Sequence, residues 1–177
     1  MPTPAPAPTG GRRRLYAVLL GLAGATLLAD QATKAWALSA LTPGEPVELV
    51  GSWIRLSVLR NPGAAFSIGD GSTWILTVVS LAILGWVVVG ARKVGNMPWA
   101  VALGLLLGGA VGNLVDRFFR APGPGRGHVV DFIAYFDWFV GNVADIAIVV
   151  AAGLIMVLTY RGTSIAGPVH HPEHADD

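Results

Sequence analysis

Several polar side chains of this chain could do chemistry, and they stand near the ends of long apolar runs. Ionisable groups cost about 2.5–3.5 kcal/mol each at the centre of a membrane-spanning helix on insertion scales, so they are functional candidates by default. Carboxylates, amides and cations are the types present, a combination suited to acid–base chemistry. The candidates are Asp30, Lys34, Asn61, Asn113, Asp116, Arg117, Asp131, Asn142 and Asp145.

Spacing separates the carboxylates that have a cation at hand from those that do not. Asp30 and Lys34 are i, i+4, so they share a helix face and can form an ion pair. Asp116 can be neutralised by the adjacent Arg117 or by Lys34. Two asparagines each precede an aspartate by three residues, which places amide and carboxylate one turn apart on one helix face.

Asp131 and Asp145 are left without a cation adjacent in sequence. Two unpaired carboxylates that face one pocket share a proton, because both cannot ionise at close range. The ionised member can take a proton from water while the neutral member donates a hydrogen bond to a scissile carbonyl. Such a pair titrates as a unit. These two residues therefore predict aspartic-protease chemistry.

Simpler interpretations exist for the same residues. Asp145 alone is an ordinary helix N-cap or interfacial charge, and Asn61 before a proline is an ordinary turn residue. Asp30 with Lys34 fits a structural pair. The convergence of so many polar groups at one end of the expected helices favours a site instead. Composition and spacing still allow a proton-coupled transporter, which also uses intramembrane carboxylates, or a non-catalytic membrane scaffold.

The bulk composition indicates a membrane protein. Of the 177 residues, 53% are hydrophobic and 13% are charged. That charged fraction is about half the roughly 25% of an average soluble domain. The net charge of +1 provides no basic face for nucleic acid. Cysteine is absent, which excludes disulfides, thiol catalysis and thiolate metal sites.

Four apolar runs are each long enough to cross a bilayer core, which takes about 20 residues of helix. We expect these helices at residues 15–38, 72–91, 97–115 and 138–160. They would form one membrane domain over residues 15–160. We expect a disordered N-terminal tail at 1–14 and a polar C-terminal tail at 161–177, both cytoplasmic. The histidines of the second tail, His170, His171 and His174, are expected to be solvated rather than metal-binding.

The outer loops are expected to cover the polar end of the bundle. Around Ile54, Leu56 and Val58, apolar and polar residues alternate, which predicts a strand in a small extracytoplasmic β-sheet within residues 39–71. Residues 116–137 would form a second outer loop with a flexible "APGPGRG" insertion. The Lys/Arg totals on the two sides are equal. The basic residues directly before the first helix and in the short inner loop favour a cytoplasmic N-terminus. The expected fold is an all-α, four-helix membrane bundle with this sheet and loop over the site.

Five motifs carry a resemblance to a known family. In order they are "DQATK" (30–34), "RNPGAAFSI" (60–68), "GGAVGNLVDR" (108–117), "VVDFI" (129–133) and "NVADIAI" (142–148). Together they resemble the blocks of lipoprotein signal peptidase, also called signal peptidase II. The insertion between Asp116 and Asp131 is longer than expected for that family, and Gly141 stands where the family usually has Phe.

The resemblance implies a multi-pass aspartic endopeptidase of the bacterial cytoplasmic membrane, with its site near the outer face and no metal or cofactor. Its substrates would be diacylglyceryl-modified prolipoproteins, cleaved just before the lipidated cysteine, and its other partners membrane lipids. We expect a monomer. By the family pattern Asp131 and Asp145 look like the catalytic pair, and Asp116 with Arg117 looks like a support. Asp30, Lys34, Asn61, Asn113 and Asn142 look like the polar shell that holds the site and the substrate backbone.

Overall fold

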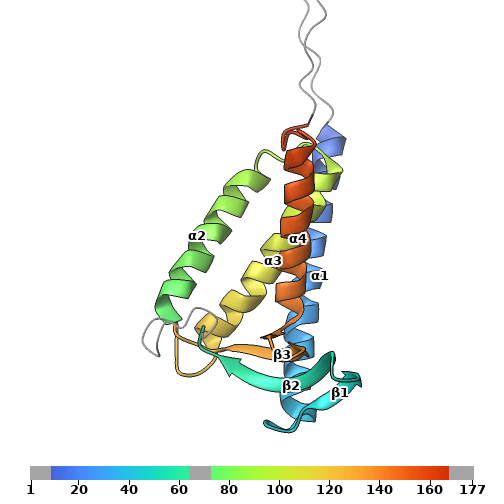
Figure 1. Ribbon diagram of the computed structural model, residues 1–177. Helices are drawn as coiled ribbons and strands as arrows, with labels where there is room; N and C mark the ends of the chain where they lie inside the picture. The colour runs from blue at the N-terminus through green and yellow to red at the C-terminus, as the bar shows by residue number, and fades with distance from the viewer. Residues whose placement is uncertain (1–8, 64–72, 168–177) are drawn as a thin grey trace, which may run out of the picture.

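The computed structural model describes residues 9–63 and 73–167. Its helices are α1 (Thr9–Ala40), α2 (Thr73–Ala91), α3 (Met97–Phe119) and α4 (Val143–Tyr160). Its strands are β1 (Val47–Val50), β2 (Ile54–Asn61), β3 (Val129–Tyr135) and β4 (Phe139–Gly141). The helices form a bundle, the sheet lies across one end of it, and the start of α1 and the end of α4 lie at the other end (Figure 1). The expected four-helix bundle with a small sheet is confirmed.

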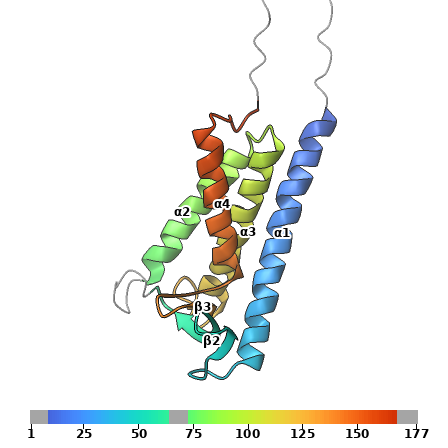
Figure 2. The same ribbon diagram turned by 45° about the vertical axis from the view of Figure 1, so that its right-hand side comes forward.

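Helix α3 forms the centre of the bundle. It packs against α1, α2 and α4, and it contributes more buried residues than any other described helix. All four helices are long and apolar enough to cross a membrane. Their outward faces carry exposed apolar side chains such as Leu28, Trp86 and Val149, as expected for surfaces that contact lipid. Seen from the side, α1 runs along one edge of the bundle and α2 along the other (Figure 2).

Glycines on α3 allow its neighbours to approach closely. A Cβ at Gly108 would lie 2.6 Å from the carbonyl oxygen of Ala23 on α1. A Cβ at Gly109 would lie 2.6 Å from the carbonyl oxygen of Ala144 on α4. Small residues at such positions give the close backbone packing that membrane helices depend on, because lipid supplies no hydrophobic drive between them. The polar ends of α1, α3 and α4 are thereby brought together.

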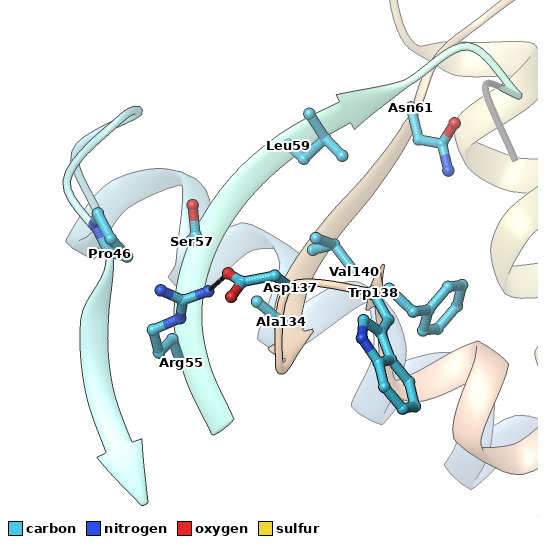
Figure 3. Close-up of a pocket in the computed structure, with 10 residues that line it drawn as sticks. Pro46, Arg55, Ser57, Leu59, Asn61, Ala134, Asp137, Trp138 and Val140 are labelled. Carbon is cyan, nitrogen blue, oxygen red and sulfur yellow. Dashed lines mark hydrogen bonds and ion pairs between the residues drawn. The ribbon is translucent and has the colours of Figure 1, made fainter. Parts of the chain in front are cut away.

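The antiparallel sheet has the strand order β1-β2-β3-β4. Asn61 on β2 pairs with Val129 on β3, and Leu59 pairs with Asp131. Asn61 and Asp131 are therefore diagonal neighbours on one face of the sheet. A groove of about 410 Å³ runs over part of the sheet, and Arg55 forms an ion pair with Asp137 within it (Figure 3). The predicted strand is confirmed as β2, while β3 and β4 were not expected.

Three expected helix boundaries differ from the structure by more than two residues. The third helix continues to Phe119 rather than ending at residue 115, so Asp116 and Arg117 lie in α3 and not in the outer loop. The fourth helix begins at Val143 rather than at residue 138, because Phe139–Gly141 pair with β3 and Asn142 caps the helix. The first helix begins at Thr9, so residues 9–14 belong to α1 and not to a disordered tail. Arg12 holds this first part of α1 by donating a hydrogen bond of 2.9 Å to the carbonyl of Arg92.

Segments expected to be loose are tied down by hydrogen bonds. In the "APGPGRG" insertion, the amide of Gly127 donates to the carbonyl of Arg117, and Thr77 on α2 donates to the carbonyl of Gly125. In the C-terminal segment the indole of Trp99 donates to the carbonyl of Thr163. The "GDG" turn at 69–71 and the three tail histidines lie outside the described residues.

Candidate active site

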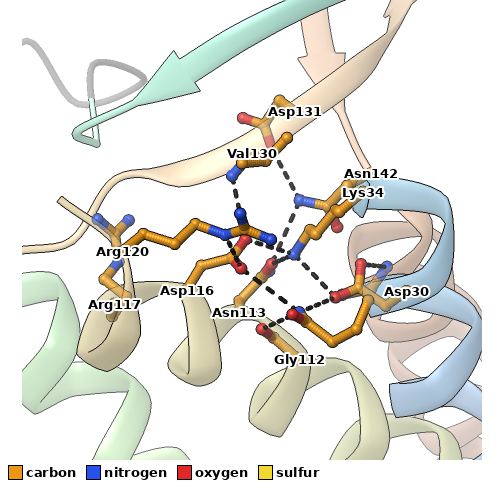
Figure 4. Close-up of polar contacts among 12 residues, drawn as sticks. Asp30, Lys34, Gly112, Asn113, Asp116, Arg117, Arg120, Val130, Asp131 and Asn142 are labelled. Carbon is orange, nitrogen blue, oxygen red and sulfur yellow. Dashed lines mark hydrogen bonds and ion pairs between the residues drawn. The ribbon is translucent and has the colours of Figure 1, made fainter. Parts of the chain in front are cut away.

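The candidate residues converge at the end of the bundle beneath the sheet, and Figure 4 shows all of them except Asn61 and Asp145. Asp30 and Lys34 come from α1, Asn113, Asp116 and Arg117 from α3, Asn142 and Asp145 from α4, Asn61 from β2, and Asp131 from β3. Hydrogen bonds, ion pairs or a shared cavity connect every one of them to the others. Asp131, expected on a loop, lies on a strand paired on both sides.

Lys34 is the buried centre of an ion cluster. Its ammonium nitrogen lies 2.8 Å from Asp30, 2.9 Å from Asp116 and 3.0 Å from the side-chain oxygen of Asn113. Its three donors are thereby satisfied by three acceptors. Lys34, Asp30 and Asp116 are all fully buried, and a buried charge is tolerated only when it is paired and hydrogen-bonded. The expected Asp30–Lys34 pair is present.

Asp116 is neutralised from two sides, but not by Arg117. Besides Lys34, it forms an ion pair with Arg120, one turn further along α3, and it accepts a hydrogen bond of 3.0 Å from the amide of Val130. Arg117 instead donates to the carbonyls of Pro62 and Gly127, at 3.4 and 3.3 Å. Of the two cations expected for Asp116, Lys34 is confirmed, whereas Arg117 is directed elsewhere, because adjacent helical residues point in different directions and residues four apart share a face.

Two asparagine amides connect the ion cluster to the remaining carboxylates. Asn113 accepts from Lys34 and donates to Asp145 at 2.9 Å. Asn142 donates to Asp131 at 2.7 Å and to Asn113 at 3.2 Å. Each amide has its oxygen and nitrogen engaged, so neither side chain can rotate without losing hydrogen bonds. The amides therefore fix the positions of Asp131 and Asp145.

Asp131 is buried, with 2% of its surface exposed, and accepts hydrogen bonds on both oxygens. Asn61 donates to Oδ2 at 2.8 Å and Asn142 to Oδ1 at 2.7 Å. Burial, opposed by these hydrogen bonds and reinforced by the nearby charge of Asp145, raises the pKa of Asp131 to about 6 from the ordinary 3.8. Asn61 thus orients a carboxylate and is more than a turn residue.

Asp145 stands at the head of α4 in a reciprocal capping arrangement. Its backbone amide donates to the side chain of Asn142 at 3.0 Å, and its carboxylate accepts from the backbone amide of Asn142 at 3.1 Å. The second carboxylate oxygen accepts from Asn113. The interpretation of Asp145 as the N-cap is therefore wrong: Asn142 is the N-cap, and Asp145 is the third residue of the helix in a capping box. Capping also directs the Asp145 carboxylate toward the space below the sheet.

A cavity of about 120 Å³ lies between the two carboxylates. Asp131, Asp145, Asn61, Asn113 and Arg117 are among the residues that line it. This volume holds a water molecule with room to spare, since a site for one water needs about 10–15 Å³. The arrangement is thus two carboxylates, a space for water, and amide donors around it.

Phe139 borders this cavity and two neighbouring ones. It lines the groove over the sheet, of about 410 Å³, and an apolar pocket of about 290 Å³ that extends from Asp145 along Ile146 and Val149 of α4. Its ring stacks on Tyr135, with centroids 6.2 Å apart. An elongated ligand could therefore reach the carboxylates from the outer groove or from the apolar face of α4.

Sequence reasoning missed three residues of this region. Gln31 donates hydrogen bonds to Asp30 at 3.0 Å and to the carbonyl of Gly112 at 3.1 Å. Arg120 could have been found from its i, i+4 spacing to Asp116. Phe139 has no signal in sequence, because its role depends on β4. In the described part of the chain, no three or more metal-ligating side chains are grouped to hold a metal ion.

Comparison with known proteins gives the family. The family model for signal peptidase (SPase) II matches residues 22–161. The chain belongs to the signal peptidase II family. It is 48% identical over 166 residues to the lipoprotein signal peptidase of Streptomyces coelicolor, covering 94% of this chain and 81% of that one. It is 50% identical over 157 residues to the lipoprotein signal peptidase of Rhodococcus jostii, covering 89% and 78%.

A solved structure agrees with the fold of this signal peptidase II. A bacterial membrane enzyme determined by the in meso method at 1.9 Å resolution matches with a TM-score of 0.72 and 28% identity, over 82% of this chain and 94% of that one. The expected lipoprotein signal peptidase, an aspartic endopeptidase that removes signal peptides from prolipoproteins, is confirmed. The transporter and scaffold alternatives are thereby set aside.

Proposed function

We propose that Asp131 and Asp145 are the catalytic pair with which this signal peptidase II cleaves prolipoproteins. The observation that supports this is that neither carboxylate is held in an ion pair. Among the residues that the structure describes, every ion pair of the site involves Asp30 or Asp116, and none involves Asp131 or Asp145. Both line one cavity, and amides orient both. Asp116, the other candidate for the role of Asp131, is neutralised by both Lys34 and Arg120.

Charge balance supports a single proton shared by the pair. The charges of Asp30 and Asp116 are matched by those of Lys34 and Arg120. Arg117 is the one cation among the described residues that line the cavity. Asp131 and Asp145 with one proton between them carry a single negative charge, which Arg117 offsets. A second ionisation would leave an uncompensated buried charge.

The proposed chemistry assigns opposite protonation states to the two carboxyls. Asp131, whose pKa is raised to about 6, is the neutral member and donates a hydrogen bond to the scissile carbonyl. Asp145 is the ionised member and takes a proton from the attacking water. The water oxygen bonds to the carbonyl carbon, and the Asp131 proton stabilises the oxyanion. On collapse, Asp145 gives its proton to the leaving amine as the C–N bond breaks, and Asp131 recovers its own.

The substrate class that we propose is the diacylglyceryl-modified prolipoprotein, cleaved before the lipidated cysteine. The apolar pocket along α4 opens from Asp145 toward side chains on the membrane-facing surface, such as Val149. A signal peptide entering from the bilayer would reach the carboxylates along this face. The groove over the sheet, with Arg55 and Asp137, offers a polar path for the mature segment.

We propose a cytoplasmic N- and C-terminus, which places the site and the sheet at the outer face. The basic residues Arg12–Arg14 and Arg92–Lys93 at the opposite end support this orientation. We also propose that the enzyme works as a monomer, since one chain supplies both carboxylates and all of their amide donors.

The test of the substrate class is cleavage of a matched pair of precursors. The purified enzyme is incubated with a diacylglyceryl-modified prolipoprotein and with the same precursor carrying serine in place of the lipobox cysteine. We expect mass spectrometry to show the modified precursor cut just before its cysteine and the serine form intact. Equal cleavage of both, or a cut elsewhere, would contradict the proposed specificity.

A further inference from the structure

The end of the bundle opposite the active site carries charge of one sign. Residues 9–16, 90–99 and 158–167 lie there, and they include six cations and no Asp or Glu. The cations are Arg12, Arg13, Arg14, Arg92, Lys93 and Arg161. Every carboxylate side chain that the structure describes lies toward the other end. Unlike the cations of the active site, these have no described carboxylate to neutralise them.

Four of the six cations converge on one cleft. Arg12, Arg14, Arg92 and Lys93 line a space of about 820 Å³ between the start of α1 and the turn that joins α2 to α3. We call this space the cationic cleft. Arg13 and Arg161 lie at the same end but do not line it. An excess of Lys and Arg near the helix ends is enough to set the orientation of a protein in the membrane. That role does not require the cations to line one cavity, so it does not explain why four of them do.

Hydrogen bonds hold the two walls of the cleft together. The guanidinium of Arg12 and the hydroxyl of Tyr16, both on α1, donate to the carbonyl of Arg92, at 2.9 and 3.2 Å. The turn between α2 and α3 is closed by a hydrogen bond of 2.9 Å from the amide of Lys93 to the carbonyl of Gly90. The cationic side chains are therefore carried by a fixed backbone.

Apolar residues line the cleft together with the cations. Leu15, Val94 and Met97 line it, and Val94 is buried. Helix α3 begins beside the cleft, with Asn96 as its N-cap. The positive end of the α3 dipole therefore adds to the positive charge at the cleft. Because the apolar spans start here, the cleft lies at the level of the lipid headgroups. A ligand that fits is an anion with hydrocarbon attached.

We propose that the cationic cleft is a binding site for an anionic glycerophospholipid, with the phosphate held by Arg14, Lys93 and their neighbours. Basic pockets between membrane helices are suited to lipid phosphate because each cation near the headgroup adds attraction of the same sign. The first atoms of the acyl chains would rest on Leu15 and Met97. A bound lipid would tie α1 to the α2–α3 turn, at the end of the molecule remote from catalysis.

The test compares two double variants with equal loss of charge at the same end of the protein. Arg14→Gln/Lys93→Gln removes cations that line the cleft, and Arg13→Gln/Arg161→Gln removes cations that do not. The full-length enzyme in detergent is titrated with phosphatidylglycerol, phosphatidylcholine or inorganic phosphate, and its thermal midpoint is followed. We expect phosphatidylglycerol to raise the midpoint of the wild type and phosphatidylcholine to leave it unchanged.

The expected loss is specific to the cleft variant. Each cation removed should weaken binding about fivefold, so Arg14→Gln/Lys93→Gln should bind phosphatidylglycerol about 25-fold more weakly, with the control pair close to wild type. Cleavage of prolipoprotein should continue in both variants, which shows that they fold. Equal weakening in the two pairs, an equal response to phosphatidylcholine, or a full response to inorganic phosphate alone would overturn the lipid site.

Discussion

At the scale of single residues, Asn142 does most to bring the site together. It caps α4, donates to Asp131 from its side chain, and contacts Asn113, which in turn donates to Asp145. The sequence identified Asn142 and Asp145 by their three-residue spacing on one helix face, without showing that Asn142 is the cap. Its contact with Asp131 depends on β3 lying against α4, which no local pattern encodes.

The raised pKa of Asp131 predicts how activity and stability depend on pH. Since its pKa is about 6 in the folded protein and near 3.8 when exposed, the folded state binds more protons between these values. Stability should therefore fall as pH rises from about 4 to 6. As pH rises, the pair loses its shared proton, so the kcat/KM of the free enzyme should decline with a midpoint near pH 6.

The measurement is kcat/KM and thermal midpoint across pH 4–8, with Asp131→Asn as the control for stability. The variant cannot titrate at this position, so its stability should vary less between pH 4 and 6. A kcat/KM that rises steadily through pH 6, or an unchanged stability profile in Asp131→Asn, would contradict the protonation states assigned here.

Arg117 and Arg120 illustrate what residue types and spacing can and cannot settle. Of the two cations expected for Asp116, Lys34 is present and the adjacent Arg117 is not, while Arg120, which was not expected, follows from helix geometry because it lies at i+4. The carbonyls that Arg117 contacts, those of Pro62 and Gly127, come from two separate connections. That arrangement follows only from the folded chain.

At the scale of elements, hydropathy was sufficient for the helices and insufficient for half of the sheet. The apolar runs located all four spans, and alternation located β2. Strand β3 is buried along almost its whole length, and apolar residues on both faces surround Asp131, so it lacks the period-2 signal. Strand β4 has three residues, and its pairing with β3 moves the start of α4 to Val143.

The glycine face of α3 predicts a specific destabilisation. In Gly108→Ala the new Cβ would lie 2.6 Å from the Ala23 carbonyl oxygen and 2.6 Å from Thr26 Cβ, so α1 and α3 must separate. We expect a loss of about 1–3 kcal/mol, the usual cost of overpacking, seen as a lower thermal midpoint in detergent.

Gly153→Ala is the matched control for this substitution. It makes the same change in α4, at a glycine whose added Cβ would meet nothing within 4 Å. Its thermal midpoint should stay at or above that of the wild type. Similar midpoints for Gly108→Ala and Gly153→Ala would show that close approach of α1 and α3 does not stabilise the bundle.

At the scale of the whole molecule, the two ends of the bundle have different chemistry. One end gathers the carboxylates, the amides and the sheet, and the other gathers cations without described acids. This polarity was visible in the sequence once the four spans were placed. What the sequence did not show is that the cations near α1 and the α2–α3 turn face a common cleft.

The proposed orientation predicts opposite labelling of the two ends. The chain contains no cysteine, so single-cysteine variants can be labelled without background. Glu45→Cys, in the exposed connection before β1, should react with a membrane-impermeant maleimide in intact cells. Arg161→Cys, just after α4, should react only after permeabilisation. The reverse pattern would place the active site on the cytoplasmic side.

The pairing of Asp131 with Asp145 is the central feature of the proposed mechanism. The most direct measurement is the cleavage rate of a diacylglyceryl-modified prolipoprotein by Asp131→Asn and by Asp145→Asn, with the thermal midpoint of each variant as the check on folding. Because each carboxyl has a separate step to perform, we expect each substitution alone to abolish cleavage while the protein remains folded. Cleavage at the wild-type rate by either folded variant would contradict the catalytic pair.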